Sequence, residues 1–411
     1  MDRRRLLALG AAGFAGAAAA PAVGVAQELA PLPNAPPPIG RDERTARIAK
    51  AQRLMRELGF GALLVEPGSS LIYFTGVRWS RSERLTCALI PAEGQVCIVT
   101  PFFEEPSVRE SLGVAAEVRT WQEHEDPTAL VAGWLKDRKL GSATVGIEET
   151  NRYFIVDGLK RNLPTATLKN GAPVVRGCRM IKTAPEIALM QRASDITMAA
   201  YRRTIPMVEA GMRPQDIGQI MNRATAALGG QPEFALVLLG EAAAYPHGSG
   251  KPQAVTAGEV VLMDCGCTFQ GYQSDISRTF VFGEATAKQR KVWNEVKRGQ
   301  EIAFEAARLG ATCGSVDDAA RNYYVSLGYG PDYKLPGLSH RTGHGIGMDG
   351  HEPVNLVRGE TTKLAPGMCF SDEPGIYIPG EFGVRLEDCF HMTEQGPQWF
   401  SQPSVSLEKP V

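Results

Sequence analysis

The sequence predicts two consecutive domains, an α/β domain in the N-terminal part and an α+β domain in the remainder. Three observations carry this prediction. The chain has 411 residues, which is long enough for two hydrophobic cores. Short strand-like runs alternate with helical stretches before residue 180. A helix-start signal near residue 183 then opens a second series of helices and strands, separated by glycine-rich turns.

The first residues are typical of an export signal. Residues 1–26 combine three arginines at positions 3–5 with an Ala/Gly/Leu-rich stretch and small residues suited to cleavage. Arginines followed by two leucines resemble a twin-arginine signal, and a Sec signal or an uncleaved anchor is the alternative. We therefore predict a bacterial protein that is periplasmic or secreted. No later run is long enough for a stable membrane span after signal removal.

Residues 27–41 are rich in proline, which predicts an extended tether. Hydrophobic residues at helical spacing then predict a helix over 42–58. Four short β-rich runs and a further helix over 127–138 complete an α/β domain over 42–180. The expected strands are 62–65, 71–74, 87–90 and 96–99.

A capping box marks the start of the second domain, which we place over residues 181–405. Thr183 and Glu186 are three residues apart, and Pro185 is tolerated in the first turn of a helix. A long helix is therefore expected to follow Thr183.

Charge and cysteine content restrict the classes of partner and site. Lys and Arg number 44 against 45 acidic residues, so no strong field favours nucleic acid. Eight cysteines include no CxxC pair of the kind that binds zinc. Cys265 and Cys267 share one face of a predicted strand and cannot easily bridge each other, whereas Cys87 and Cys97 flank a hairpin turn. Buried free thiols are the expectation.

The segment 260–282 is predicted to form a hairpin that carries two carboxylates. A turn at 268–271 would place Asp264 directly opposite Asp275. Such neighbours repel each other unless something neutralises them, and a divalent cation would do so.

A second hairpin repeats this arrangement. A loop centred on Gly380 would place Glu373 opposite Glu387. A single pair would more often consist of solvated strand or turn carboxylates. Recurrence of the pair between apolar runs favours a metal site.

Histidines cluster between the two hairpins. Three of the six fall in one glycine-rich segment, namely His340, His344 and His351. His247 lies in a Tyr-Pro-His-Gly sequence. A lone histidine is more often packed or solvated than functional, but clustering favours a functional role here. His124 and His391 stand apart, and we expect them to be structural.

These motifs resemble the signatures of the pita-bread metallopeptidases, the M24 family of aminopeptidase P and prolidase. The matching stretches are Asp264-x10-Asp275-Ile-Ser-Arg-Thr, Gly343-His344-Gly345-Ile346-Gly347, His351-Glu352, Glu373-Pro374-Gly375 and Arg385-x-Glu387-Asp388. With Arg179-Met-Ile-Lys182, the resemblance extends over roughly residues 42 to 400. It implies an N-terminal creatinase/prolidase-like α/β domain followed by an α+β pita-bread (creatinase/aminopeptidase) catalytic domain.

The resemblance implies two divalent metal ions. The ligands would be Asp264, Asp275, His344, Glu373 and Glu387, with Asp275 and Glu387 bridging the ions. This oxygen-rich set favours manganese, while cobalt or zinc could substitute. The implied nucleophile is a hydroxide that bridges the two ions, since such ions lower the pKa of water.

Further roles follow from the same resemblance. Glu373 would carry a proton to the leaving nitrogen, and His247 and His351 would bind the substrate and stabilise the tetrahedral intermediate. His340 is a weaker candidate, either for a catalytic proton shuttle or for a residue that supports the ligands from behind.

Three more residues have supporting or specificity roles. Thr279 and Arg385 would orient the ligands through hydrogen bonds. Some prolidases carry an arginine four residues after the His-Glu histidine, and this chain has Asn355 there. Arg358 is then the nearest candidate for binding a substrate carboxylate.

The implied activity is hydrolysis of the peptide bond that precedes proline, by a Xaa-Pro dipeptidase or a Xaa-Pro aminopeptidase. The substrates would be small peptides with proline in second position, and the resemblance also implies a homo-oligomer, either a dimer or a tetramer. One alternative is a hydrolase or lyase on the same fold that acts on a zwitterionic osmolyte. A second is a non-catalytic peptide-binding module, against which the full ligand set argues.

Overall fold

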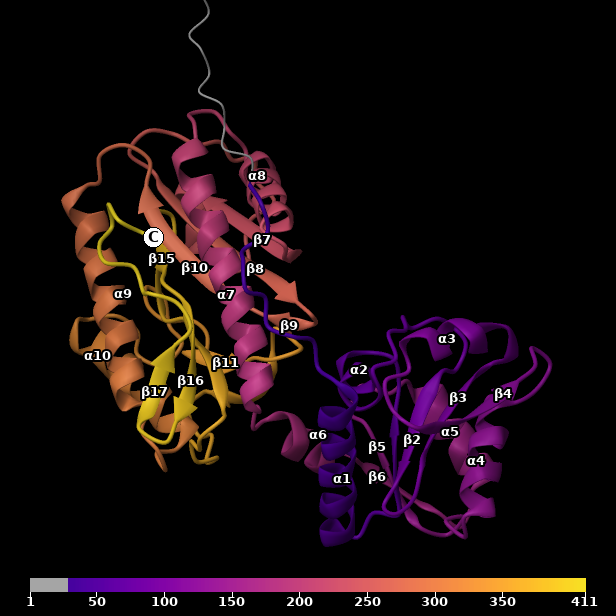
Figure 1. Ribbon diagram of the computed structural model, residues 1–411. Coiled ribbons are helices and arrows are strands. Elements are labelled where there is room, and N and C mark those ends of the chain that lie inside the picture. The colour runs from indigo at the N-terminus through magenta and orange to yellow at the C-terminus, as the bar shows by residue number, and fades with distance from the viewer. Residues whose placement is uncertain (1–28) are drawn as a thin grey trace, which may run out of the picture.

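The computed structural model describes residues 29–411, and the predicted export signal lies outside the described residues. The chain forms two bodies that meet along a narrow junction (Figure 1). The smaller body contains α1 to α6, and the larger contains α7 to β17. The proline-rich segment before α1 has no helix or strand and lies against the larger body, where the Leu32 amide donates to the Leu228 carbonyl at 3.1 Å.

The N-terminal body is a six-stranded mixed sheet with helices on both faces. The strand order is β4-β3-β2-β1-β5-β6, and β2 runs antiparallel to its two neighbours, β1 and β3. The strands are β1 (Ala62–Val65), β2 (Cys87–Pro91), β3 (Val96–Pro101), β4 (Ala116–Trp121), β5 (Thr144–Ile147) and β6 (Thr167–Asn170). The helices are α1 (Arg41–Leu58), α2 (Ser69–Thr75), α3 (Glu105–Ser111), α4 (Pro127–Asp137), α5 (Tyr153–Asn162) and α6 (Ala172–Arg179).

Two separate cores hold this sheet between its helices. Met55 of α1, Phe74 of α2 and Val174 of α6 belong to the core on one face. Trp134 of α4 and Leu159 of α5 belong to the core on the other face. Both faces are therefore covered, as burial of the short apolar strands requires.

One predicted strand is a helix. The run 71–74, which we expected to be extended, lies within α2. Gly68 and Gly76 bracket this helix with φ of 149° and 81°, and the Gly76 amide caps it by donating to the Ile72 carbonyl at 2.9 Å. A run of four apolar residues is too short for periodicity to separate a strand from a buried helical turn. The other three predicted strands and both predicted helices are confirmed to within two residues.

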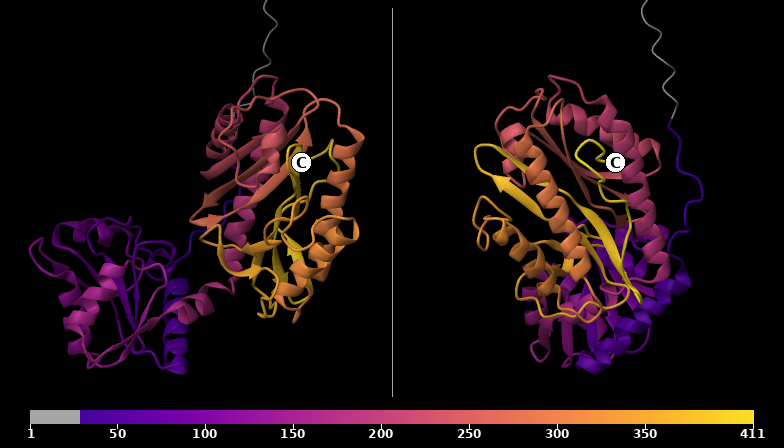
Figure 2. Two further views of the ribbon diagram at one scale, coloured as in Figure 1. Left: turned by 180° about the vertical axis from the view of Figure 1, so that it is seen from behind. Right: turned by 90° about the vertical axis from the view of Figure 1, so that its left-hand side faces the viewer.

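The C-terminal body packs two sheets against helices on their outer sides (Figure 2). Its helices are α7 (Ala184–Thr204), α8 (Pro214–Ala227), α9 (Ala287–Ala306) and α10 (Cys313–Ser326). The first sheet has the order β10-β8-β7, with β7 (Gln231–Leu239), β8 (Val260–Phe269), β10 (Ile276–Val281) and the short β9 (Tyr272–Gln273) beside β8. The predicted cap of α7 is confirmed, since the Thr183 amide donates to Glu186 Oε2 at 2.8 Å.

The second sheet supplies most of the histidine and glutamate side chains of interest. Its order is β12-β11-β13-β16-β17. Its strands are β11 (Gly343–Gly345), β12 (Glu352–Leu356), β13 (Cys369–Asp372), β16 (Asp388–Thr393) and β17 (Gly396–Trp399), and a separate ribbon joins β14 (Gly375–Ile378) to β15 (Phe382–Arg385). Helices α7 and α8 pack on the first sheet, while α9 and α10 pack on the second sheet and the ribbon.

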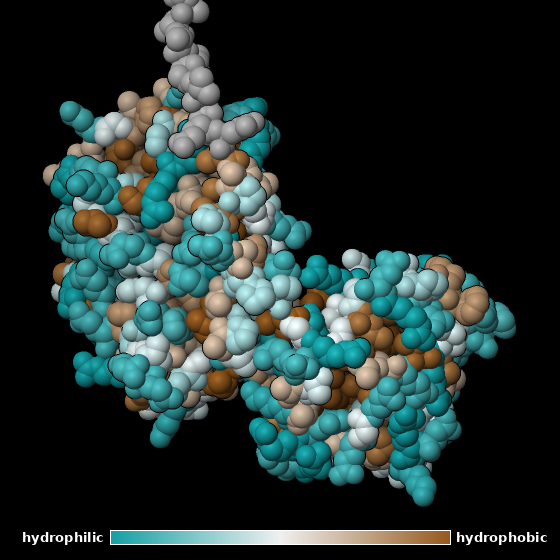
Figure 3. All heavy atoms as spheres, viewed as in Figure 1, coloured by the Kyte–Doolittle hydropathy of each residue, from teal (hydrophilic) through white to brown (hydrophobic). Residues whose placement is uncertain are grey.

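All eight cysteines are buried and free, as expected from their spacing. The visible surface is mainly hydrophilic, with scattered hydrophobic patches (Figure 3). Within residues 29–411, none of the helices is both long and apolar enough to cross a bilayer.

Candidate metal centre

The first carboxylate hairpin has a different register from the predicted one. β8 and β10 pair Asp264 with Ser277, not with Asp275. The turn consists of Gln270 and Gly271, both at positive φ (52° and 85°), so the first strand continues through residues 268 and 269, which were expected to belong to the turn. Side chains alternate along a strand, so a shift of two residues leaves Asp275 on the same face as Asp264.

The second hairpin confirms the predicted register. β14 and β15 pair Gly375 with Arg385, and β13 and β16 pair Asp372 with Asp388. The same register runs through both ladders, so Glu373 and Glu387 lie opposite each other between them.

The five predicted ligands converge from the two sheets. Asp264, Asp275 and Glu387 offer carboxylate oxygens that all lie within 4.8 Å of one another. His344, Glu373 and Glu387 form a second such group. Glu387 belongs to both groups, which is the placement expected of a bridging carboxylate.

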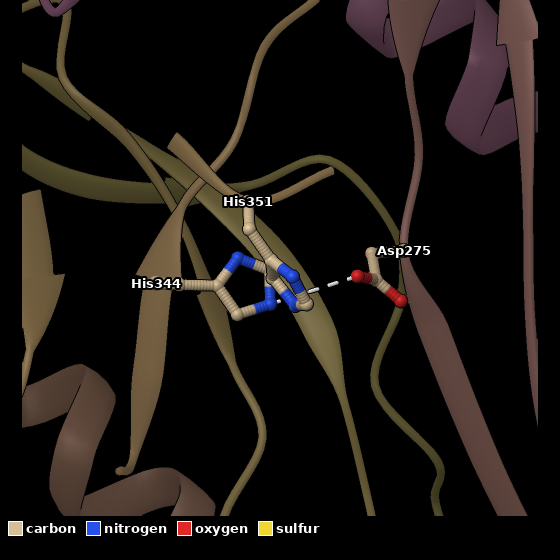
Figure 4. Close-up of side chains that lie close together, drawn as sticks. All are labelled: Asp275, His344 and His351. Carbon is tan, nitrogen blue, oxygen red and sulfur yellow. Dashed lines mark ion pairs between the residues drawn. The ribbon is translucent and has the colours of Figure 1, made fainter. Parts of the chain in front are cut away.

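Two histidines face Asp275, namely His344 in β11 and His351 directly before β12 (Figure 4). His344 Nε2 lies 3.6 Å from Asp275 Oδ2 and 3.2 Å from Glu373 Oε1. The His344 and His351 rings pack edge to face with centroids 4.0 Å apart. Asp275, His344 and His351 form a third group within 4.8 Å, so His351 lies at the edge of the centre.

The buried carboxylates fit a pair of divalent cations. Asp264 Oδ1 and Glu387 Oε1 are buried and accept no hydrogen bond from residues 29–411. Burial and then the neighbouring carboxylates raise the pKa values of Asp275 and Glu387 well above their usual range. Burial also raises the pKa of Glu373 to about 7, despite the opposing charge of Arg385. Cations would supply the missing partners and remove the repulsion.

Arg385 connects two of the carboxylates. Its Nη2 donates to Asp264 Oδ2 at 2.7 Å, and its Nε donates to Ser277 Oγ at 3.0 Å. Ser277 Oγ in turn donates to Glu387 Oε2 at 2.7 Å. Thr279 acts one step further out, because its hydroxyl bonds the backbone of Arg385 at 2.7 and 3.2 Å.

His340 lies behind the ligands and not among them. Its Nε2 lies 2.8 Å from the Tyr377 hydroxyl, which also accepts from Arg385 Nη1 at 3.3 Å. Burial and then the charge of Arg385 lower the pKa of His340 to about 3. A neutral imidazole in this position supports Arg385 and is poorly suited to carrying protons.

The structure corrects the assignment of Arg358. Its guanidinium pairs with Asp318 at 2.8 Å and with Asp332 at 2.5 Å, and 40% of the side chain is exposed. Arg358 is a surface ion-pair residue. His247, by contrast, lies on the loop after β7 that Arg385 Nη1 holds through the Pro246 carbonyl at 3.1 Å, and it lines a cavity of about 770 Å³.

Arg341 is a residue of the site that the sequence interpretation missed. It is half-buried, and its guanidinium donates no hydrogen bond and forms no ion pair within the described chain. Burial is the largest cause that lowers the pKa of His351, and the charge of Arg341 is the second largest. The charge of Arg341 also opposes the rise in the pKa of Glu373. Its position three residues before His344 was the available signal.

A cleft at the junction of the two bodies opens beside His351. It has a volume of about 700 Å³ and is lined by both bodies. Trp79 and Arg81 come from the N-terminal body, and His351 and Pro353 from the C-terminal body.

The two-sheet fold and the oxygen-rich ligand group define a metal-dependent hydrolase. The comparison with protein families is specific: the chain belongs to metallopeptidase family M24, whose pattern matches residues 188–394, and the creatinase/prolidase N-terminal domain matches residues 47–181. The protein is therefore a metallopeptidase with the pita-bread catalytic domain, and it is similar to dipeptidases and prolidases.

Individual relatives cover nearly the whole chain. A probable dipeptidase PepE of Mycobacterium tuberculosis is 33% identical over 85% of this chain and 92% of its own length. A Xaa-Pro dipeptidase of Lactobacillus helveticus is 31% identical over 87% of this chain and 97% of its own length. The crystal structure of dipeptidase PepE from Mycobacterium ulcerans has a TM-score of 0.82 at 30% identity, covering 89% of this chain and 97% of that one.

Proposed function

We propose that the chain is a Xaa-Pro dipeptidase that holds two divalent metal ions, with manganese preferred over cobalt or zinc. Asp264, Asp275, His344, Glu373 and Glu387 are the proposed ligands. The convergence of these side chains, with two buried carboxylate oxygens left without donors, is the observation that carries the proposal. The relatives named Xaa-Pro dipeptidase and dipeptidase support the same substrate class.

The residues of the chain can perform the proton transfers of peptide hydrolysis. When bound, the metal ions supply an activated water and polarise the scissile carbonyl. Glu373, which lies 3.2 Å from His344 Nε2 among the proposed ligands, accepts the proton of the attacking water. It then donates this proton to the proline nitrogen as the C–N bond breaks. His351 and His247 are placed to donate to the carbonyl oxygen as negative charge develops on it.

Arg341 favours a dipeptidase over an aminopeptidase. A Xaa-Pro dipeptide ends in a carboxylate one residue after the scissile bond, and a guanidinium without a partner beside His351 suits that charge. A longer peptide would present a neutral amide there. We therefore propose that Arg341 takes the role that sequence reasoning gave to Arg358.

The test compares a Xaa-Pro dipeptide with a Xaa-Pro-Yaa tripeptide, using metal-stripped protein with and without added manganese. We expect manganese-dependent cleavage, with higher kcat/KM for the dipeptide. Arg341→Gln should raise KM for the dipeptide at least tenfold and leave the tripeptide nearly unchanged, since only the dipeptide loses a charged partner. Arg358→Gln is the matched control.

Two outcomes would contradict the proposal at different levels. A preference for the tripeptide would replace the dipeptidase with an aminopeptidase. Failure to cleave either peptide while two metal ions bind would favour turnover of a zwitterionic osmolyte.

We also propose that residues 1–26 direct export through a twin-arginine pathway and that the mature protein is a homo-oligomer. Replacement of the arginines at positions 3–5 by lysine should retain the protein in the cytoplasm of a host with that pathway. Light scattering of the purified protein should give the mass of a dimer or tetramer. Unchanged export or a monomeric mass would contradict the respective proposal.

A further inference from the structure

A second pair of carboxylates lies next to Glu373 and Glu387 in the chain but on the opposite face of the sheet. Asp372 on β13 is directly opposite Asp388 on β16, one residue along each strand from Glu373 and Glu387. Because side chains alternate along extended chain, this pair points to the opposite face. That face is covered by α9, whose Gln300 donates from Nε2 to Asp388 Oδ2 at 3.1 Å.

Asp388 is fully partnered. Arg278 Nη2 pairs with its Oδ1 at 2.7 Å, and the Ser401 hydroxyl donates to the same oxygen at 2.5 Å. Both Asp388 and Arg278 are completely buried, so their charges balance each other inside the protein. Asp388 therefore needs no further cation.

Asp372 has no comparable partners. It is 0% exposed, and both of its carboxylate oxygens lack a hydrogen bond within residues 29–411. Gln300 is also 0% exposed, and its Oε1 is likewise without a donor. Gln300 Nε2 lies 3.4 Å from the Asp372 carbonyl, so the two residues are immediate neighbours. These two neighbouring residues thus present three buried acceptor oxygens that no donor of residues 29–411 reaches.

Asp372 also forms no ion pair within residues 29–411. Lys297 lies one helical turn before Gln300 on α9 and its charge acts to lower the pKa of Asp372, but its ion pair is with Glu301 at 3.7 Å. An enclosed carboxylate without a donor or an ion pair is costly unless a proton or a cation accompanies it.

We propose that Asp372 and Gln300 bind a monovalent metal cation, such as K⁺ or Na⁺, at a site separate from the catalytic pair. The available ligands are all oxygens, which suit a hard cation. One carboxylate and one neutral amide match a single positive charge, whereas the catalytic centre offers four carboxylates to its ions. The cation stabilises the end of β13, from which Glu373 follows directly.

The first test measures thermal unfolding of the full chain with its catalytic metals held constant. Potassium, sodium and tetramethylammonium chlorides are compared at equal ionic strength, because the organic cation is too large for an enclosed site. We expect one of the small cations to raise Tm by about 2 °C or more over tetramethylammonium. Asp372→Asn should abolish this difference, and Gln300→Met should shift it to higher salt. Equal Tm values in all three salts would refute the site.

Lys297→Met separates the site from a simpler alternative, in which Lys297 turns inward to neutralise Asp372. The proposal expects this variant to keep the salt dependence of the wild type. If the lysine were the true partner, the wild type would show no cation preference and only Lys297→Met would gain one.

A direct test needs no variant. Crystals grown with Rb⁺ or Tl⁺ should show an anomalous peak in contact with Asp372 and Gln300. A water molecule or the Lys297 ammonium in that position would overturn the proposal. Neither test depends on which peptide the enzyme cleaves, so the inference stands or falls independently of the proposed function.

Discussion

Ser277 shows how a small side chain can fix two ligands of the centre at once. Its hydroxyl accepts from Arg385 and donates to Glu387, so it occupies the gap between the two hairpins. Sequence reasoning missed it because the predicted register placed Asp275, and not Ser277, opposite Asp264. With the correct turn at Gln270, the same reasoning would have found it.

Ser277→Ala should therefore weaken metal binding without altering the fold. The change leaves Arg385 Nε and Glu387 Oε2 without their common partner, and loss of such supporting contacts costs roughly 10- to 100-fold in metal affinity. Calorimetric titration with manganese measures the effect. Ser326→Ala, at an exposed helix end, is the control. Unchanged affinity would show that Ser277 does not orient the ligand.

At the residue level, the proposed metal ligands could be named from the sequence, and the arginine proposed to bind the substrate carboxylate could not. The resemblance to the M24 motifs implied Asp264, Asp275 and His344 as ligands, and the structure brings these side chains into neighbouring groups at one site. Arg341 and Arg358 are both arginines in loops near a histidine motif, and only tertiary contacts distinguish them. The surface aspartates that pair with Arg358 come from distant positions in the chain, which no local pattern reveals.

At the level of elements, the predicted helices with clear caps were confirmed and the short elements were the source of error. The capping box of α7 and the apolar periodicity of α1 each determine their element locally. In contrast, α2 depends on packing between α1 and the sheet, and the β8–β10 hairpin depends on a two-residue turn. Tertiary burial decides such cases, and local propensity does not.

A buried ion cluster fixes the start of β12 against the linker between the bodies. Glu352 accepts from Lys182 Nζ at 3.0 Å and from Arg179 Nη2 at 2.5 Å, and it also accepts from the Met348 amide at 2.9 Å. Glu352→Gln would leave the buried Lys182 without a carboxylate and Arg179 with Asp349 alone. We expect a loss of about 3–5 kcal/mol in the free energy of unfolding, measured by denaturant titration.

Arg358→Gln provides the surface comparison for this prediction, with an expected loss of about 0–1 kcal/mol. Equal losses in the two variants would mean that the buried cluster contributes no more than an exposed ion pair.

The same cluster predicts a component of acid unfolding. Burial alone would raise the pKa of Glu352, but Lys182 and Arg179 lower it to about 2. Since the folded pKa lies below the unfolded value of about 4.3, this stabilisation is complete above that value and is lost as pH falls toward 2. The difference in unfolding free energy between wild type and Glu352→Gln should therefore shrink over that range. A constant difference from pH 6 to pH 2 would contradict the assignment.

At the level of the whole molecule, Arg179 joins the two bodies next to the cleft beside His351. It lies at the end of α6, and its Nη1 donates to Ser69 Oγ at 2.8 Å and to Ser70 Oγ at 2.9 Å in the N-terminal body. Its Nη2 pairs with Asp349 at 2.8 Å and with Glu352 in the C-terminal body. One planar guanidinium thus holds the loop that carries His351 against the wall of the cleft.

Arg179→Lys should loosen this junction while retaining the charge. An ammonium cannot reach four acceptors on two bodies in the planar geometry of a guanidinium, so the loop with His351 should lose its fixed position. We expect kcat/KM for a Xaa-Pro dipeptide to fall by about 10- to 100-fold, since small misplacements of catalytic groups have effects of this size. Manganese affinity should stay near that of the wild type, because Arg179 contacts none of the proposed ligands.

Arg176→Lys is a closely matched control. Arg176 lies on the same helix and lines the same cleft, but its guanidinium pairs with Glu149 at the surface. Small-angle scattering would report any opening of the junction. If Arg179→Lys retained full activity and an unchanged scattering profile, the junction would have to be held by its other contacts, such as the hydrogen bonds from Ser69 Oγ to Asp349 Oδ2 at 2.7 Å and from Arg47 Nη2 to the Tyr272 hydroxyl at 2.9 Å, and the loop with His351 would keep its position without this residue.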